Sequence, residues 1–298
     1  MPKTRKLRGG KPTGNVHSRA NRDRGRGQSS APLSRPNRGR GKTSSDSRVA
    51  AGRLEKSTSK NDRAIDVAIR SRHLEAAFIA LSNTNPVFLG PYSSRQRILL
   101  LGEADLSFTA ALLAGLGVSS NIVATCFESE ATLNEKYSAF AARRDALLSA
   151  GVEIKYEVDA TCLHEPQGGI GPDRETSRFD VCVFNFPHVG GGSLKEDRVA
   201  NIQMLSGFFA SSRQTACLAK PRARVHVVLR STAFYDSWDV CSIAKQAGLR
   251  FLNKEPFEVD AFEQLGYCAV RTSGDGTQMR QAPSTEKAFR YVFQIEPA

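Results

Sequence analysis

Four short apolar segments of this chain lead into polar side chains of the kind that bind ligands. These side chains are Glu103 and Asp105 after residues 98–101, Glu128 after 121–127, Asp159 after 152–158, and Asn185 within 179–186. If the segments are parallel strands of one sheet, their carboxyl ends share an edge and the side chains converge on one crevice. The acid after the second strand suits ribose hydroxyls, and Asp159 suits an adenine amino group. The pattern predicts a site for a nucleotide-like cofactor.

The turn after the first segment, GEADLS (102–107), narrows the choice of ligand. Gly102 lets the backbone approach a ligand closely, but the later glycines of the dinucleotide pattern GxGxxG are missing. Two carboxylates stand where a pyrophosphate needs hydrogen-bond donors, so an NAD-dependent oxidoreductase is the weaker alternative. Negative charge suits a cation such as the sulfonium of S-adenosylmethionine. The simplest alternative is that turns favour glycine and acids for their geometry alone.

A second polar group ends the fourth segment, where Asn185, Phe186, Pro187 and His188 precede the glycines 190–192. An amide that hydrogen-bonds the edge of a base, beside a ring that stacks on its face, makes a platform for a nucleobase. We therefore predict that Asn185 contacts a base. His188 is either a proton carrier or a turn residue, and the sequence leaves that choice open.

Strands and helices alternate along residues 97–298, which predicts an α/β domain with a doubly wound, mostly parallel, seven-stranded sheet. The expected strands are 98–101, 121–127, 152–158, 179–186, 224–229, 249–257 and 291–295. The expected helices between them are 106–116, 130–150, 197–216 and 238–247. Because no full helix separates the last two strands, we expect them to form an antiparallel hairpin. Residues 160–178 are rich in glycine, proline and charge, as is typical of a long loop.

The first third of the chain differs from the rest in charge. Residues 1–97 hold 22 Lys and Arg against 6 Asp and Glu, so the net charge of +12 comes entirely from this part. Residues 1–60 carry RG repeats and almost no large apolar side chain, which predicts a disordered basic tail. The tail either binds RNA phosphates or serves only as a targeting signal. Apolar residues return at helical spacing from Asn61, so we expect an N-terminal helix and linker over 61–96.

The six cysteines form no CxxC pair, and no window is apolar enough over its length to span a bilayer. These features predict reduced thiols, no metal site, no membrane contact and a soluble protein inside the cell. The sequence does not fix the oligomeric state, and we expect a monomer. The basic tail points to the nucleus or nucleolus, with the cytoplasm or the mitochondrial matrix as alternatives.

Seven motifs in order carry a resemblance to a known family. They are LLLGEADLSF (99–108), ATCFES (124–129), VDAT (158–161), FNFPHVG (184–190), NIQMLSGFF (201–209), RVHVVLR (224–230) and GYCAVRT (266–272). The chain resembles the yeast-type 25S ribosomal RNA uridine-N3 methyltransferases, a class I, S-adenosylmethionine-dependent family with a Rossmann-like fold. The resemblance implies methyl transfer to N3 of a uridine in large-subunit ribosomal RNA, with the pre-ribosome as partner.

Together, the strand ends and the resemblance predict the residues of the site. We expect the cofactor to be bound by Gly102, Glu103, Ala104, Asp105, Ser107, Glu128, Asp159 and Asn185. We expect a catalytic group of Asn185, Pro187 and His188; the sequence names no single base for the proton of N3, which can go to His188, Asp105 or water. The family usually has glycine where this chain has Ala104, so we expect a narrower pocket and weaker cofactor binding. The alternative is a catalytically degenerate relative that serves as an RNA-binding ribosome-assembly factor.

Overall fold

The computed structural model describes residues 60–82, 85–119, 121–165, 170, 178–215, 218, 222–270 and 287–296. The predicted basic tail lies outside these residues except for Lys60, and so does part of the predicted loop 160–178. The chain divides into two units, Met1–Glu55 and Lys56–Ala298, and the fold described below is that of the second.

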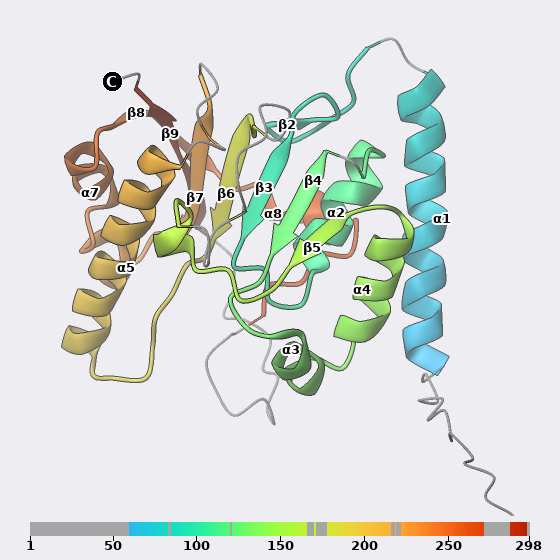
Figure 1. Cartoon of the computed structure of the whole chain (residues 1–298), viewed down its shortest axis with the longest axis horizontal. Coiled ribbons are helices and arrows are strands. Elements are labelled where there is room, and N and C mark those ends of the chain that lie inside the picture. The colour runs from blue at the N-terminus through green and yellow to red at the C-terminus, as the bar shows by residue number, and fades with distance from the viewer. Residues whose placement is uncertain are drawn as a thin grey trace, which may run out of the picture. The chain divides into compact units, whose positions relative to one another are not determined.

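A seven-stranded sheet with the order β5-β4-β3-β6-β7-β9-β8 forms the centre of the domain (Figure 1). Its strands are β3 (Ile98–Leu101), β4 (Ile122–Thr125), β5 (Glu153–Lys155), β6 (Val181–Asn185), β7 (Arg224–Arg230), β8 (Leu249–Pro256) and β9 (Ala288–Ile295). Neighbours from β5 to β7 pair in parallel, and β9 pairs antiparallel with both β7 and β8. The predicted doubly wound, mostly parallel sheet is confirmed, and so is the antiparallel pairing of the last two strands.

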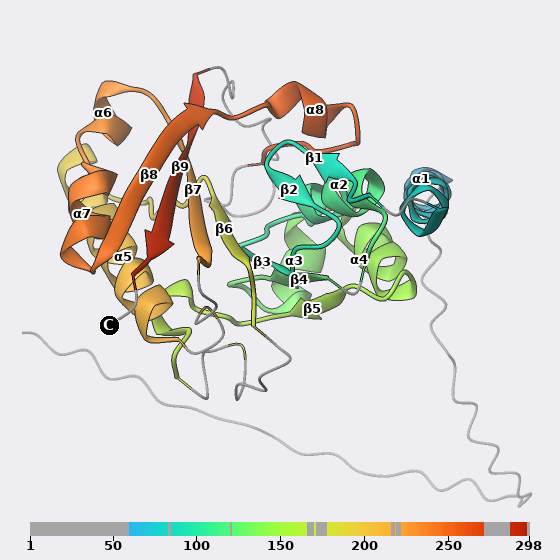
Figure 2. The same ribbon diagram turned by 90° about the horizontal axis from the view of Figure 1, so that it is seen from above.

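Helices cover both faces of the sheet (Figure 2). One face carries α5 (Leu194–Gln214) and α7 (Val240–Gln246), and the other carries α2 (Ser107–Leu116) and α4 (Phe140–Ser149), with α1 (Lys60–Ser82) packed outside α2 and α4. In β3, Ile98 and Leu100 enter the core under α2, whereas Leu99 and Leu101 enter the core under α5. The strand is apolar throughout because both of its faces are buried.

The predicted helix 130–150 is wrong as a single element, because the chain forms α3 (Glu130–Lys136) and then α4. The break falls at Tyr137, which has the extended dihedral angles φ −124° and ψ 109°. Its side chain is 3% exposed, so the helix ends where this ring enters the core. The third strand is also shorter than predicted, since Glu157 takes a left-handed φ of 57°.

Several short elements were not expected from the sequence. They are the hairpin of β1 (Phe88–Leu89) and β2 (Tyr92–Ser93), the 3-10 turn η1 (Ala160–Cys162), α6 (Ala233–Asp236) and α8 (Val259–Glu263). Helix α5 starts before the predicted residue 197, because Ser193 and Glu196 form a reciprocal capping box. None of the helices in the described ranges has the length and apolar character needed to cross a membrane.

Candidate functional site

The candidate site lies at the carboxyl edge of the sheet, where the chain changes direction. From β3 the chain continues to β4 and β5 on one side, and it then resumes at β6 on the other side of β3. Ligands of open α/β sheets bind at such a switch point. Leu101 pairs with Phe184 in register, so Gly102 and Asn185 are the next residues on adjacent strands. The structure therefore brings the first and the last predicted strand end together.

Gly102 is required by the backbone and by its neighbour. Its φ is +64°, a left-handed conformation that favours glycine, and a Cβ atom added there would lie 2.8 Å from Cε2 of Phe184. The ring of Phe184 packs edge-on against Phe208 of α5, with centroids 5.1 Å apart. The tight turn after β3 is thus fixed by the core beneath it.

Glu103 points into the fold. Its side chain accepts hydrogen bonds from the backbone nitrogen (3.1 Å) and the hydroxyl (2.7 Å) of Thr109, in the first turn of α2. It thereby satisfies an amide that the helix itself leaves unpaired. Burial raises the pKa of Glu103 from an ordinary value of 4.5 to about 7, although the hydrogen bonds from Thr109 oppose this rise.

The raised pKa of Glu103 makes stability depend on pH. Between pH 4.5 and about 7 the carboxyl group is protonated in the folded protein and ionised in the unfolded chain. The stabilisation that Glu103 contributes to the folded state is therefore complete below pH 4.5 and is lost as the pH rises to about 7. The free energy of unfolding falls by roughly 3 kcal/mol over this range. Glu103→Gln keeps an acceptor for Thr109 but does not titrate. Chemical unfolding across this range should show the variant gaining stability relative to the wild type as the pH rises, and a constant difference would contradict the assignment.

Asp105 and Ser107 are also engaged within the fold. Oδ1 of Asp105 accepts hydrogen bonds from the nitrogen (3.1 Å) and the hydroxyl (2.7 Å) of Ser107, while Oδ2 pairs with Nη1 of Arg143 at 2.6 Å. Oγ of Ser107 accepts a further bond from the nitrogen of Cys268 at 3.2 Å. The two carboxyl groups of the turn therefore hold its shape, and the charge that was predicted to suit a cationic ligand is paired with Arg143 at Asp105.

Ala104 fits the backbone without strain. It is not among the described residues with positive φ, whereas Leu106, two positions later, has a φ of 61°. Its methyl group packs against the core cluster under α2. Glycine is therefore not required at this position by the conformation of the chain.

Glu128 and Asp159 each keep one carboxylate oxygen available. Oε1 of Glu128 pairs with Nζ of Lys136, and its side chain is 26% exposed. Oδ1 of Asp159 accepts bonds from the nitrogen and the hydroxyl of Thr161, both at 2.8 Å. Within the described part of the chain, Oε2 of Glu128 and Oδ2 of Asp159 make no hydrogen bond. Both groups can therefore accept hydrogen bonds from a ligand.

Asn185 carries an unsatisfied buried atom. Its Oδ1 is shielded from solvent and has no hydrogen-bond partner among the described residues. A buried acceptor without a partner costs about 1–3 kcal/mol, so a ligand that donates a hydrogen bond here gains that energy. Pro187 is buried, and Phe186 adopts a left-handed φ of 49°. His188 is exposed and lies above three aromatic rings of the segment 234–238.

The sequence interpretation missed Arg230, the last residue of β7. Val228 pairs with Asn185 in register, so Arg230 lies just beyond it on the same face of the sheet. Its Nε is buried and has no partner among the described residues. The signal was present in the motif RVHVVLR, in which a cation ends a strand that is otherwise buried. Two unsatisfied buried groups thus lie on neighbouring strands at the carboxyl edge.

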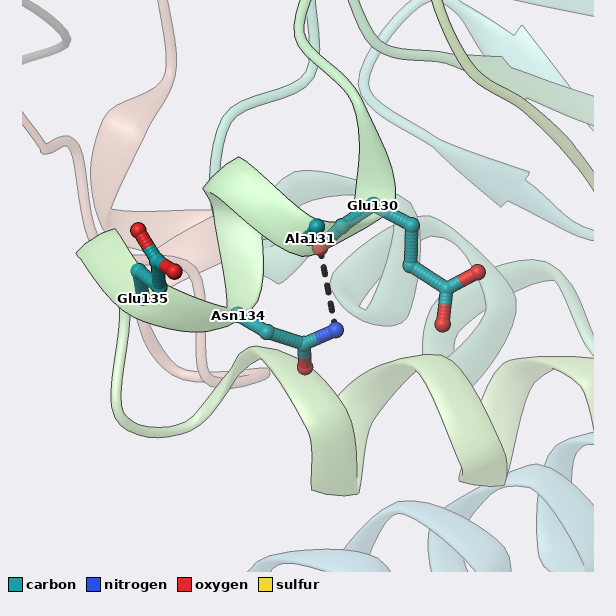
Figure 3. Close-up of a pocket in the computed structure, with 4 residues that line it drawn as sticks. All are labelled: Glu130, Ala131, Asn134 and Glu135. Carbon is teal, nitrogen blue, oxygen red and sulfur yellow. Dashed lines mark hydrogen bonds between the residues drawn. The ribbon is translucent and has the colours of Figure 1, made fainter.

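A separate hollow of about 520 Å³ lies on α3 and is lined by Glu130, Ala131, Asn134 and Glu135 (Figure 3). Nδ2 of Asn134 donates a hydrogen bond to the carbonyl oxygen of Glu130 at 2.9 Å, and the two glutamate side chains point away from each other. All four residues belong to one helix. The hollow contains none of the predicted site residues.

A comparison with models of protein families shows to which family this chain belongs. The model of a BMT5-like family, described as rRNA (uridine-N3-)-methyltransferase BTM5-like, matches residues 99–271, which is more than half of the chain. The chain belongs to this family. The matched range includes all predicted site residues, and the sheet has the predicted Rossmann-like, doubly wound topology.

Relatives of this BMT5-like protein occur in plants and animals. An uncharacterized protein of Arabidopsis thaliana is 29% identical over 188 residues, a match that covers 61% of this chain and 85% of that protein. Heavy metal-associated isoprenylated plant protein 41 of the same species is 31% identical over 65% of this chain and 36% of its own length. Ferredoxin-fold anticodon-binding domain-containing protein 1 homolog of Mus musculus is 32% identical over a match that covers 66% of this chain and 31% of that protein. The chain therefore spans about a third of the length of the isoprenylated plant protein and of the mouse protein.

Two solved methyltransferase structures match much of this chain at low sequence identity. The 16S rRNA methyltransferase KamB is 16% identical, with a TM-score of 0.37, and the match covers 72% of this chain and 100% of that one. The glycopeptide N-methyltransferase MtfA, complexed with S-adenosyl-L-homocysteine, is 13% identical, with a TM-score of 0.39. The match covers 76% of this chain and 87% of that one.

Proposed function

We propose that this protein transfers a methyl group from S-adenosylmethionine to N3 of a uridine in large-subunit ribosomal RNA. Membership of the BMT5-like family supports the reaction class. The observation that carries the proposal is the buried, unpartnered Oδ1 of Asn185 at the switch point of the sheet. The donor on the Watson–Crick edge of uracil is N3–H, and it matches this acceptor.

The side chains at the carboxyl edge fit the proposed cofactor. Glu128 and Asp159 retain carboxylate oxygens that suit two ribose hydroxyls and an adenine amino group. Glu103, Asp105 and Ser107 shape the turn that bears Gly102, and so they support the cofactor site through the backbone. When bound, S-adenosylmethionine supplies an electrophilic methyl group on a sulfonium.

The residues of β6 and its loop orient the uridine. Before the transfer, Oδ1 of Asn185 accepts the N3–H of the flipped base and Nδ2 donates to the neighbouring carbonyl oxygen of uracil. The contact to N3 is given up as the base loses its proton, because the methyl group must approach N3 from the same direction. Pro187 fixes the loop that holds this amide. As the nitrogen–carbon bond forms, the carbon–sulfur bond of the donor would break to leave S-adenosylhomocysteine, and the proton must leave N3. Both oxygens of Asp105 are already bonded, and His188 lies among the rings of residues 234–238 on the other face of the sheet, so we propose that water takes the proton.

The direct test combines methylation with binding. The purified chain is incubated with large-subunit ribosomal RNA and a labelled methyl donor, and modified uridines are mapped. We expect N3-methyluridine at a single position, and a product at another base or atom would overturn the proposal. Calorimetry with S-adenosylmethionine separates the alternative function, since an assembly factor without catalysis should bind none at millimolar ligand.

We propose that the basic tail, residues 1–60, binds ribosomal RNA through its phosphates. The tail accounts for most of the excess of Lys and Arg in this chain. Each phosphate contact releases condensed counterions, so deleting the tail should weaken RNA binding and reduce its salt dependence. The dissociation constant is measured at several salt concentrations with and without the tail. Identical curves would show that the tail is only a targeting signal.

A further inference from the structure

The loop after β6 and the short helix α6, far apart in the sequence, meet beside the candidate site and form an aromatic surface. The ring centroid of His188, after β6, lies 6.3 Å from Phe234, 6.1 Å from Tyr235 and 6.2 Å from Trp238. The rings of Phe234 and Tyr235 are 5.5 Å apart. His188 is exposed, Phe234 and Tyr235 are partly exposed, and Trp238 is buried beneath them. We call His188, Phe234 and Tyr235 the aromatic platform.

Helix α5 holds both halves of the platform in place. Asn201, which is fully buried, accepts a hydrogen bond from the nitrogen of Val189 (2.8 Å) and donates one to its oxygen (2.7 Å). Arg198 donates from Nη2 to the oxygen of Ser237 (2.7 Å) and from Nε to its hydroxyl (3.1 Å). Residues three apart lie on one face of a helix. One face of α5 thus fixes the loop that carries His188 and the turn that follows Tyr235.

The platform lies on the opposite face of the sheet from Asn185. Val181 and Val183 alternate with Cys182 and Phe184 between the two cores, and Asn185 continues the row of the two valines. Phe234 and Tyr235 pack against the other core. A base stacked on the platform is therefore different from the base held by Asn185, although both lie at the same edge of the sheet.

The platform also has positive charge beside it. Arg198 is exposed and makes no ion pair with a carboxylate in the described ranges of the chain. Aromatic rings that stack on bases, next to a guanidinium that meets phosphate, are the combination used to bind single-stranded nucleic acid. An apolar or basic partner would leave the guanidinium of Arg198 without a counter-charge.

We propose that the aromatic platform stacks an unpaired base that flanks the target nucleotide of the RNA substrate, with Arg198 facing its phosphate. This inference rests on the proposed function for the identity of the substrate. It assigns Phe234 and Tyr235 to base stacking and Asn201 to positioning. Arg198 both positions the turn at Ser237 and binds the phosphate. The platform would hold the strand while the target base is turned toward Asn185.

Trp238 provides the first test, because it is the only tryptophan of the chain and its ring centroid lies 4.7 Å from that of Tyr235. The full chain is titrated with a single-stranded uridine-rich RNA and with an abasic oligomer of the same length. We expect the RNA, and not the abasic oligomer, to change the tryptophan fluorescence. Equal changes with both oligomers would show that only phosphates are bound and would overturn the proposal.

Substitutions provide the second test. Phe234→Ala should raise the dissociation constant and the KM for RNA about 5- to 100-fold, the range found for loss of one base stack, while the affinity for S-adenosylmethionine stays unchanged. Phe234→Tyr keeps the ring and should bind RNA normally. Phe251→Ala is the matched control, since Phe251 is 43% exposed on β8 and lies outside the platform. An unchanged KM for RNA in Phe234→Ala would refute the platform.

The two proposals fail in different ways. If RNA changes the fluorescence but no methyl group is transferred, the platform stands and the catalytic proposal falls. If uridine is methylated while Phe234→Ala keeps the wild-type KM for RNA, the catalytic proposal stands and the platform falls.

Discussion

Replacement of Asn185 with alanine should lower kcat for methyl transfer about 10²- to 10³-fold, the loss seen when one hydrogen-bonding group of a polar site is removed. Stability should respond in the opposite direction. Because Oδ1 is buried without a partner among the described residues, its removal relieves a desolvation penalty. We expect the free energy of unfolding to stay constant or to rise by about 1 kcal/mol. Single-turnover kinetics and chemical unfolding of the same preparation check both expectations.

Asn121 supplies the matched control for this substitution. Its Nδ2 donates a hydrogen bond of 2.7 Å to the oxygen of Ser94, away from the candidate site. Asn121→Ala should therefore cost about 1 kcal/mol of stability and leave kcat unchanged. Full turnover by Asn185→Ala would remove this residue from the catalytic group.

Replacement of Arg143 with alanine should destabilise the protein by about 3–5 kcal/mol, the cost of leaving a buried charge unpaired. The side chains of Arg143 and Asp105 are 15% and 7% exposed, so solvent cannot take the place of the ion pair. Arg143 also donates to the backbone oxygen of Asp105 at 3.1 Å. Loss of both contacts should distort the turn after β3, and cofactor affinity should fall together with stability. Thermal unfolding and calorimetry measure the two effects.

The next residue in the sequence is the control. Arg144 pairs with Glu130 and Asp145, whose side chains are 46% and 54% exposed. Such surface pairs contribute about 0–1 kcal/mol, so Arg144→Ala should be nearly neutral. Equal losses in the two variants would mean that the ion pair of Asp105 has no special role in the turn.

The sheet was predictable because its signals are local. The run ILLL at 98–101 reads as a strand buried on both faces, and the alternation of strands and helices implies parallel pairing. The polar residues at strand ends follow from the same pattern. Asn185 lies beside Gly102 because β6 returns next to β3, which is the normal topology of a doubly wound sheet.

The direction of side chains was not predictable in the same way, because it depends on partners distant in sequence. Asp105 is turned from the ligand side by Arg143, 38 residues later. Asn201 and Arg198 appear in the sequence as ordinary polar residues of a helix, and their role becomes visible only with the loops they hold. Composition and periodicity contain no signal for such contacts.

The position of β9 has a consequence for how the protein is made. This strand follows all the others in the chain, yet it lies between β7 and β8, and β8 has no other neighbour among the described strands. Strands β3 to β7 can pair as they leave the ribosome, whereas β8 cannot join the sheet before β9 has been synthesised. Until residues 288–295 have been synthesised, β7 keeps an open edge of the kind that pairs with other chains. The nascent protein therefore has one late, aggregation-sensitive step at which chaperone protection matters most.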